Sequence, residues 1–343
     1  MRAVRFHGRG DIRVDEIEEP VCGNGQVKIR PAFVGICGSD LHEYLAGPMI
    51  VTTTPHPLTG GKLPATLGHE FSGTVEEVGS DVTGFKVGDR AVVKPNLFDA
   101  TCTSCSVGRF NSCEKLGFIG YSIVDRKNAI LLPDSVPLDV GALVEPLAVA
   151  WHAVSRSPLQ TNDTVLVVGA GPIALAIIQV LKAKGVTSII AVEVSERRRE
   201  FALALGATEV LNPVDVDVVT QVRVLTGNVG AAVAFECSGV QAGLDTAIAG
   251  LRVRGTTVVV SMWEQMPIIN ALAVVYQEKH VIGAVIYDDG DFEAVIDAIA
   301  SGDIQPRSMI TSKIRMEDVD EKGFKALIEE RDKHVKILVD ISA

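Results

Sequence analysis

One apolar run of the chain extends over 164–181, reads TVLVVGAGPIALAIIQVL and carries no charge. Its length is that of a candidate membrane-spanning helix. However, Gly-Ala-Gly-Pro interrupts the run after five residues that favour strands. A strand that is buried on both faces is apolar throughout, without alternation. We therefore predict a buried strand, a tight turn and a helix here, and no membrane span.

Short runs with strand character fill the first 150 residues. The runs alternate between apolar and polar residues or are rich in β-branched residues, and turn residues bound them. Such runs predict strands, and together they predict a compact, barrel-like β domain. The clearest examples read QVKIRPAFVGI, FSGTVEEVG and GFKVGDRAVV.

The pattern changes near residue 150, where strands begin to alternate with helices. The segment SIIAVEVSERRREFALALGA repeats the strand-turn-helix pattern of 164–181, and Gly206 is placed to end its helix. Strands that alternate with helices predict a parallel sheet with right-handed crossovers. Further strands are predicted at EVL, AAVAFEC, GTTVVVSM and HVIGAVIY.

The tail of the chain holds an amphipathic helix, DFEAVIDAIASGDI, and ends in a strand, VKILVDI. We expect this tail to pack back onto the first domain. The sequence thus predicts an α/β protein with a β-rich domain, 1–150 and 286–343, and a doubly wound parallel-sheet domain, 151–285. A chain of 343 residues is long enough for two such cores.

Composition narrows the classes of function. The formal net charge of −11 argues against a nucleic-acid partner, because binding phosphates needs a basic footprint. The N-terminal residues contain no apolar segment typical of secretory signals, so we expect a cytoplasmic protein without a membrane partner. The six cysteines are then interpreted as thiols or metal ligands before disulfides. We interpret Cys22 and Cys237 as structural residues.

Candidate chemistry in the second domain lies at the turn after its first strand. Gly169, Gly171 and Ala174 form a G-x-G-x-x-A pattern that follows a strand and opens a helix. Gly169 permits the turn, Gly171 lets the backbone approach a pyrophosphate, and Pro172 and Ile173 begin the helix whose N-terminus would bind it. The pattern predicts a dinucleotide site; a nucleotide fold without its nucleotide is the alternative.

Glu193 ends the next predicted strand. Its carboxylate would accept hydrogen bonds from the adenosine ribose and repel a 2′-phosphate, which favours NAD over NADP. Arg197 and Arg198 stand nearby, and an arginine can pair with a 2′-phosphate. The alternative for both arginines is the solvated face of a charged helix. Arg198 is kept as a candidate cofactor contact.

The first domain carries a dense group of polar residues, because a thiol, a hydroxyl, a carboxylate and an imidazole fall within 37–42. His69 and Glu70 follow in LGHEFSG, and Glu145 follows in ALVEPLAVAWHAV. Thiolate, imidazole and carboxylate are ligands of a catalytic zinc that keeps one position open. Taken singly, His69 and Glu70 would be an ordinary polar turn and Glu145 a carboxylate at a helix N-terminus. Their combination with a dinucleotide fold favours zinc.

Six segments together are typical of one family: GICGSDLHEYLAGP, TLGHEFSGTVEEVGSDVTGFKVGDR, LGFIGYS, LVEPLAVAWHAV, VGAGPIALAIIQVLKAKG and VAFECSG. Through them the chain resembles the zinc-dependent medium-chain dehydrogenases/reductases over nearly its full length. It is similar above all to the polyol and 2,3-butanediol dehydrogenase branch, and to fungal members in particular. The resemblance implies a GroES-like catalytic domain, a Rossmann cofactor domain, a homodimer or homotetramer, and Zn²⁺ and NAD as cofactors.

The resemblance also implies a role for each residue of the zinc site. Cys37, His69 and Glu145 would hold zinc, with Glu70 as an alternating or water-mediated fourth ligand. One thiolate and two carboxylates against Zn²⁺ leave a negative charge in excess, so that one carboxylate can yield to water or substrate. Asp40 would orient His69 from behind.

Ser39 would contact the alcohol substrate and start a proton relay that passes through the nicotinamide ribose to His42. Zinc lowers the pKa of bound water to about 7 and would acidify an alcohol likewise. The implied reaction is hydride transfer between NAD and a secondary alcohol, above all a vicinal diol such as 2,3-butanediol. Two alternatives stay open: a biosynthetic dehydrogenase for a bulkier alcohol or ketone, and a nucleotide-binding homologue without redox activity.

A second metal site is suggested by the segment DATCTSCSVGRFNSC. Many relatives hold a structural zinc on four cysteines with this spacing, whereas here the first position is an aspartate. A zinc site with three cysteines and one aspartate and an empty site with three packed thiols are equally compatible with the sequence. The four candidate ligands are Asp99, Cys102, Cys105 and Cys113.

The chain departs from the family pattern at two places. Ile286 stands where polyol-type relatives carry an arginine, which removes a donor for sugar-alcohol hydroxyls and favours smaller or less polar substrates. After GFIGYS, relatives carry a glycine-rich loop and a strand that reads roughly FAEY, whereas here Ser122 runs straight into IVDRKNAILLPD. Because this segment helps to wall the substrate cleft in relatives, we expect a wider, wetter cleft near Tyr121.

Overall fold

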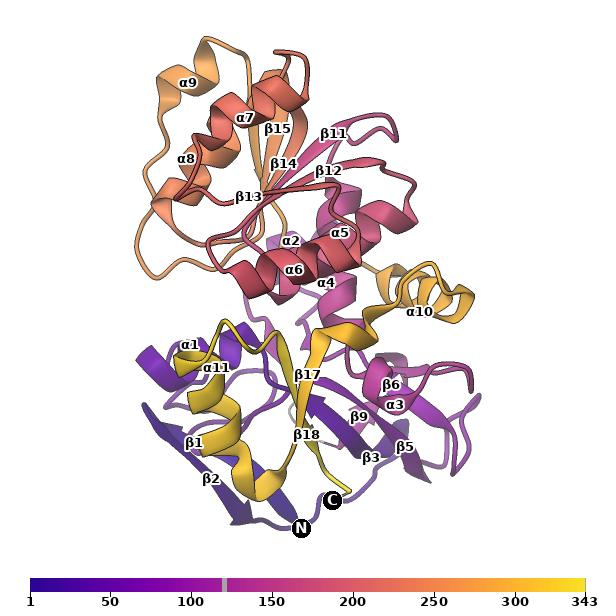
Figure 1. Cartoon of the computed structure of the whole chain (residues 1–343). Helices are drawn as coiled ribbons and strands as arrows, with labels where there is room; N and C mark the ends of the chain where they lie inside the picture. Colours follow the sequence, from indigo (N-terminus) through magenta and orange to yellow (C-terminus); the bar gives the residue numbers. More distant parts are fainter. Residues whose placement is uncertain (119–121, 343) are drawn as a thin grey trace. The chain divides into compact units, whose positions relative to one another are not determined.

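The computed structural model of the chain describes residues 1–118 and 122–342. Contacts between Cα atoms divide the chain into two units, 1–145 with 292–300 and 310–343, and 146–291 with 301–309 (Figure 1). The boundary at 145 falls inside the helix α4 (Val144–Arg156), and not at its end. These limits differ by a few residues from the predicted domain limits.

Residues 301–309 were expected in the first domain but group with the second unit. Here Gln179 accepts a hydrogen bond from the backbone N of Gln305 (3.2 Å) and donates one to the sulfur of Met309 (3.1 Å). Met309 is fully buried. These contacts tie the segment to α5 (Pro172–Ala183).

The first unit is built around a largely antiparallel sheet in the order β10-β6-β5-β3-β18-β17, with β9 also paired to β3. The C-terminal strand β18 pairs with β3, so segments far apart in the sequence share this sheet (Figure 1). Its core consists of alternate residues of the strands, among them Val27, Ile29, Phe71 and Val75. The strands are β3 (Gln26–Gly35), β5 (Glu70–Val78), β6 (Arg90–Val93), β9 (Ile123–Asp125), β10 (Ala129–Leu131), β17 (Ile310–Arg315) and β18 (Lys336–Asp340).

Two smaller sheets and several short helices complete this unit. The order β2-β1-β4 forms one sheet, and β7 pairs with β8 to form the other. The strands are β1 (Arg2–Gly8), β2 (Asp11–Glu16), β4 (Ala65–Thr66), β7 (Asn96–Leu97) and β8 (Gly117–Phe118). The α-helices are α1 (Gly38–Ala46), α2 (Thr103–Ser106), α3 (Leu138–Gly141), α10 (Asp291–Ser301) and α11 (Ala326–Glu329).

The second unit holds a parallel sheet of six strands in the order β13-β12-β11-β14-β15-β16. This is the order 3-2-1-4-5-6 of a doubly wound dinucleotide fold. The strands are β11 (Thr164–Val168), β12 (Ser188–Val192), β13 (Glu209–Leu211), β14 (Ala231–Glu236), β15 (Leu251–Val259) and β16 (His280–Gly283). The α-helices are α4 from Pro146 onward, α5, α6 (Glu196–Leu205), α7 (Val218–Leu225), α8 (Gln241–Ala249) and α9 (Ala271–Val275).

Burial explains the apolar run over 164–181. Every residue of β11 after the first is buried, and so is α5 from Ala174 to Leu181. The run is therefore a central strand and a covered helix, as predicted. Gly206, with φ +128°, ends α6. No helix in the described part of the chain is long and apolar enough to cross a membrane.

Candidate zinc and dinucleotide sites

Three of the predicted zinc ligands converge in the first unit. Cys37 is the N-cap of α1, Glu70 is the first residue of β5, and His69 immediately precedes it. One ligand atom from each of the three residues lies within 4.8 Å of the others. Thiol, imidazole and carboxylate thus meet as the ligand set of a catalytic zinc requires.

Pairing between β3 and β5 brings these ligands together. Gly35 at the end of β3 lies opposite Glu70 at the start of β5. A Cβ atom at position 35 would lie only 2.2 Å from an oxygen of the Glu70 carboxylate, so glycine leaves room for this side chain where it stands. Gly68, with φ +101°, turns the chain immediately before His69.

Asp40 lies behind both Cys37 and His69. Its Oδ2 accepts a hydrogen bond from the backbone N of Cys37 (2.9 Å), and its Oδ1 lies 3.8 Å from Nδ1 of His69. Burial raises the pKa of Asp40. Burial alone would lower the pKa of His69, but the nearby Cys37, Asp40 and Glu145 raise it well above its usual value. The negative charges of these neighbours therefore favour a cation at this cluster.

Glu145 stands in the first turn of α4 and is buried. It lies outside the group of ligand atoms within 4.8 Å, although its charge acts on the pKa of His69. Burial raises the pKa of Glu145 itself to about 7. The structure thus brings Cys37, His69 and Glu70 together and places Glu145 beside them.

Lys336, which is fully buried in β18, was not identified from the sequence. Its Nζ donates to both carboxylate oxygens of Glu70 (2.7 and 2.6 Å) and to the carbonyl oxygen of Ile36 (3.1 Å). A lysine within the apolar strand VKILVDI was the available signal. Its positive charge balances the negative charge that the predicted ligand set leaves in excess.

Ser39 and His42 both lie on α1, near Cys37. They are three positions apart, which places them on one face of the helix. Both are partly accessible to solvent. This placement is compatible with the proton relay, which stays a prediction.

The glycine-rich turn lies between β11 and α5 in the second unit. Gly169 has φ +96°, and a Cβ atom there would lie 3.3 Å from the backbone of Cys237 and Ser238. Gly171 is the N-cap of α5, Pro172 follows in its first turn, and Ile173 remains partly exposed. The backbone N–H groups at this helix terminus can bind a pyrophosphate.

Glu193 follows β12 and fixes the shape of the turn. Its Oε2 accepts a hydrogen bond from the backbone N of Ala170 (2.8 Å), and its Oε1 accepts one from Ser195 (2.9 Å). A carboxylate has further lone pairs, so it can still accept hydrogen bonds from a ribose.

The arginines after Glu193 have different partners. Arg197 forms an exposed ion pair with Glu200 (2.6 Å), as a solvated helix face predicts. Arg199 donates to the carbonyl oxygens of Glu193 (3.1 Å) and Val194 (2.6 Å), a role that the sequence did not indicate. Arg198 keeps its interpretation as a candidate cofactor contact.

Glu236 at the end of β14 was also not identified from the sequence. Its fully buried carboxylate accepts hydrogen bonds from the backbone N of Ser238 (2.8 Å) and of Gly239 (3.0 Å), and from the hydroxyl groups of Ser238 and Ser261. It therefore joins the ends of β14 and β15 at the edge where this fold binds dinucleotides. Burial raises the pKa of the neighbouring Cys237 thiol, which fits a structural residue.

The second predicted metal cluster also converges. The ligand atoms of Asp99, Cys102, Cys105 and Cys113 lie within 4.8 Å of one another. Backbone N–H groups bind the Asp99 carboxylate and lower its pKa, and Lys115 lies 3.1 Å from it. Burial raises the pKa of Cys105 to about 12. Three thiols and a carboxylate at this spacing fit a tetrahedral zinc.

The two departures from the family pattern can be located only in part. Ile286 adopts a left-handed backbone conformation with φ +58°, which is unusual for a β-branched residue. Ser122 precedes β9, and its carbonyl oxygen accepts a hydrogen bond from the backbone N of Ile29 (2.6 Å). The expectation of a wider cleft near Tyr121 falls outside the described residues.

Comparison with known proteins identifies the family. Residues 172–301 match the zinc-binding dehydrogenase family, and residues 23–156 match the alcohol dehydrogenase GroES-like domain. The chain is 44% identical to the (R,R)-butanediol dehydrogenase of Bacillus subtilis (strain 168), over 99% of both chains. It is 37% identical to the (R,R)-butanediol dehydrogenase of Saccharomyces cerevisiae, over 99% of this chain and 98% of that protein.

Solved structures agree with this relationship. The crystal structure of 2R,3R-butanediol dehydrogenase from Bacillus subtilis superposes with a TM-score of 0.93 at 42% identity, over 99% of both chains. A dehydrogenase from Escherichia coli CFT073, solved with NADH, gives a TM-score of 0.87 at 26% identity, over 99% of both chains. The chain belongs to the zinc-dependent medium-chain alcohol dehydrogenase family, with a GroES-like unit and a Rossmann unit.

Proposed function

We propose that this member of the zinc-dependent medium-chain dehydrogenases interconverts a vicinal diol and its hydroxyketone, with 2,3-butanediol and acetoin as the type pair. The convergence of Cys37, His69 and Glu70 in the GroES-like unit carries the proposal. NAD(H) serves as hydride acceptor or donor, and the glycine-rich turn of the Rossmann unit would bind its pyrophosphate. The enzyme is an oxidoreductase with zinc and NAD as cofactors.

The residues of the first cluster fit a zinc ion that keeps an open position. Cys37, His69 and Glu145 would hold it, and Glu70 would act as an alternating fourth ligand. When bound, zinc supplies Lewis-acid chemistry that lowers the pKa of a hydroxyl group. Lys336 supports the alternation, because it gives the Glu70 carboxylate a buried partner whenever that carboxylate is not a ligand.

Side chains of α1 would move the proton that leaves the substrate hydroxyl. Ser39 would accept this proton, and His42 would receive it from the nicotinamide ribose and release it to solvent. Asp40 would hold the His69 ring in one orientation through the Nδ1 side. Relay residues of this type supply general acid–base catalysis.

The carboxylate of Glu193 would select NAD, because a 2′-phosphate would meet a negative charge. The same carboxylate anchors Ala170 in the glycine-rich turn, so cofactor choice and turn shape depend on one side chain. Arg198 would contribute a further contact to the cofactor.

A homo-oligomer, either a dimer or a tetramer, would assemble in the cytoplasm through the Rossmann unit. Its sheet ends at the edge strand β16. Large apolar side chains are exposed in the segment before this strand, and a patch of this kind is typical of an interface. They are Met266, Ile268, Leu272, Val275 and Tyr276. Sedimentation velocity of the purified protein would give the assembly size.

A substrate panel tests the proposed reaction. The zinc-loaded protein is given NAD⁺ with each 2,3-butanediol stereoisomer, with sorbitol, and with bulkier secondary alcohols. We expect the highest kcat/KM for one butanediol stereoisomer and a weak response to sorbitol, since Ile286 supplies no hydrogen-bond donor for further hydroxyls. Preference for a bulky alcohol would favour the biosynthetic alternative. Zinc binding without any turnover would favour a homologue that has lost redox activity.

A further inference from the structure

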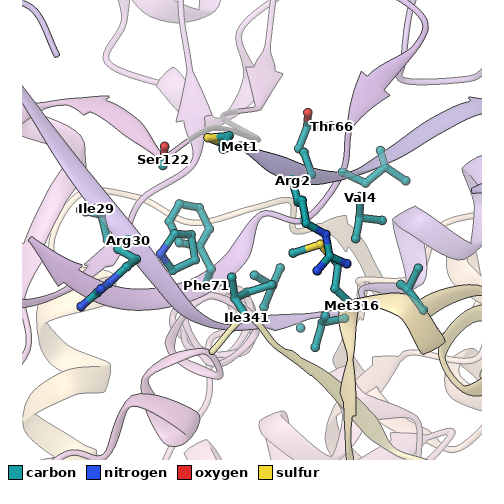
Figure 2. Close-up of a pocket in the computed structure, with 18 of the residues that line it drawn as sticks. Met1, Arg2, Val4, Ile29, Arg30, Thr66, Phe71, Ser122, Met316 and Ile341 are labelled. Atoms are coloured by element: carbon teal, nitrogen blue, oxygen red, sulfur yellow. The ribbon is translucent and has the colours of Figure 1, made fainter. Parts of the chain in front are cut away.

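We propose that a cavity in the wall of the GroES-like unit binds a small, uncharged, largely apolar molecule that carries a single hydroxyl or carbonyl group. The cavity has a volume of about 290 Å³ (Figure 2). Gly35, Ile36 and Asp40 line one end, so it lies behind the loop that carries Cys37. Neither Cys37 nor His69 lines it, and Asp40, which lies behind both, stands between the cavity and the candidate zinc ligands.

The cavity arises because two strands share one edge of β3. On this edge β9 pairs with 26–28 of β3, and β18 pairs with 33–35. The opposite edge of β3 is occupied by β5 over its whole length. Within the described residues no strand covers the edge between these two short pairings. The cavity opens there, lined by Ile29, Pro31, Ser122 and Ile341.

Apolar side chains form most of the cavity surface. Ile29 is fully buried, and Phe71, Ile36 and Val339 are nearly so. Phe71 and Ile341 project into the middle of the view in Figure 2. A cavity with such a lining favours an apolar occupant, because burial removes apolar surface of the ligand from water.

Ser122 supplies an unsatisfied polar group in this apolar wall. The residue is only 6% exposed, and its hydroxyl has no hydrogen-bond partner. Figure 2 shows it on the wall of the cavity near Met1. Buried hydroxyl groups are normally hydrogen-bonded. Because the oxygen atom itself is almost inaccessible, the Ser122 side chain would rotate toward the cavity, where a ligand hydroxyl or carbonyl would satisfy it and fix the orientation of the ligand.

The charged residues at the rim argue for an uncharged ligand. Arg2 forms an ion pair with Glu317. Lys28 pairs with Glu19 (2.5 Å) and Glu76 (3.4 Å). Because these charges already have partners, an ionic ligand would have to displace one of them. The remaining rim arginine, Arg30, extends away from Ser122 and Phe71 in Figure 2.

The volume of the cavity determines the size of the compound that is used to test binding. An apolar cavity of about 150 Å³ binds benzene, so a cavity of about 290 Å³ suits two fused rings. The compound 2-naphthol has this size and one hydroxyl group. Its hydroxyl-bearing carbon carries no hydrogen, so it cannot donate a hydride, and its binding is measured independently of the dehydrogenase reaction.

The test is a titration of the zinc-loaded, full-length protein with 2-naphthol, followed by calorimetry. We expect saturable binding at one site. Ser122→Ala should weaken it by about 2- to 12-fold, the range for one hydrogen bond, whereas Ser80→Ala on the surface should not. Ile341→Trp should fill the cavity and weaken binding more than tenfold, whereas the exposed Val21→Trp should bind like the wild type. Ile341→Phe replaces Ile341→Trp if the larger side chain prevents folding.

Three results would overturn the proposal. The first is no saturable binding to the wild type, and the second is equal binding to the wild type and the filled variant. The third is tighter binding of 2-naphthoate than of 2-naphthol, because the rim would then prefer an anion. Unchanged affinity in Ser122→Ala would refute the assigned hydrogen bond. None of these results depends on whether the protein oxidises 2,3-butanediol.

Discussion

Lys336 and Glu70 form a buried ion pair, in which Nζ of Lys336 lies 2.7 and 2.6 Å from the two carboxylate oxygens. Both side chains are almost completely inaccessible, at 2% and 1%. The carboxylate therefore contacts a buried lysine and also belongs to the group of candidate metal ligands with Cys37 and His69. This arrangement explains how a carboxylate can remain charged in the interior when it is not a zinc ligand.

Replacing Lys336 should show how far the stability of the protein depends on a buried partner for the Glu70 carboxylate. We expect Lys336→Met to destabilise the zinc-free protein by about 3–5 kcal/mol, because it leaves a buried carboxylate without a partner. The loss should be smaller in the zinc-loaded protein, where the metal can take the carboxylate. Denaturant unfolding with and without zinc measures both values.

The surface pair Lys333–Glu330 provides the matched control for this experiment (3.0 Å). Lys333→Met should cost about 0–1 kcal/mol, as exposed pairs do. If Lys336→Met cost the same with and without zinc, Glu70 would not reach the metal.

Removal of the Cys37 thiol should impair the zinc site and leave the dinucleotide site intact. We expect Cys37→Ser to abolish turnover and zinc binding at this cluster, while NADH still binds to the glycine-rich turn of the Rossmann unit. NADH fluorescence, metal content and kcat measure these three properties. Near-normal activity with normal zinc content would show that Cys37 is not a ligand.

Cofactor choice should depend on the charge of Glu193. Wild-type kcat/KM should be higher with NAD than with NADP, and Glu193→Ser should narrow that difference. The substitution also removes the hydrogen bonds to Ala170 and Ser195. Glu193→Gln is therefore the control, because it removes the charge but keeps an acceptor for one of these N–H groups. A wild-type preference for NADP would instead assign the contact with a 2′-phosphate to Arg197 or Arg198.

The cysteine cluster should hold zinc independently of the catalytic site. We expect Cys105→Ser to release a single equivalent of zinc and to lower the melting temperature, because structural zinc contributes to folding. Cys22→Ser, outside both clusters, should do neither. Metal analysis and thermal unfolding test this. Unchanged zinc content would mean that the three thiols are simply packed together.

Local patterns in the sequence predicted much of the fold. The glycine-rich turn, α5 and the end of α6 at Gly206 follow from residues that are close in sequence. The zinc ligands could be proposed because each lies in a short family motif. The distances between these ligands could not be predicted, because they depend on the register in which β3 pairs with β5.

Contacts between distant segments account for what the sequence did not reveal. Lys336 and Glu70 are 266 positions apart, and only the placement of β18 beside β3 brings them together. Glu236 lies in a strand that is buried throughout, and its role depends on turns that follow two different strands. The cavity depends on where β9 stops along β3, which no local pattern specifies.

The proton relay makes the final prediction. Removing the imidazole in His42→Ala should slow alcohol oxidation by roughly 10²–10⁴-fold, the range for a lost acid–base group. The defect should be larger at low pH than at high pH, because hydroxide becomes more abundant as pH rises and can accept the proton directly. His7→Ala is the control, since His7 pairs with Asp15 on β2 and lies outside the zinc cluster (2.7 Å). The measurement is kcat across the pH range with a saturating diol. A defect that does not change with pH, or no defect, would remove His42 from the relay and leave Ser39 to release its proton by another route.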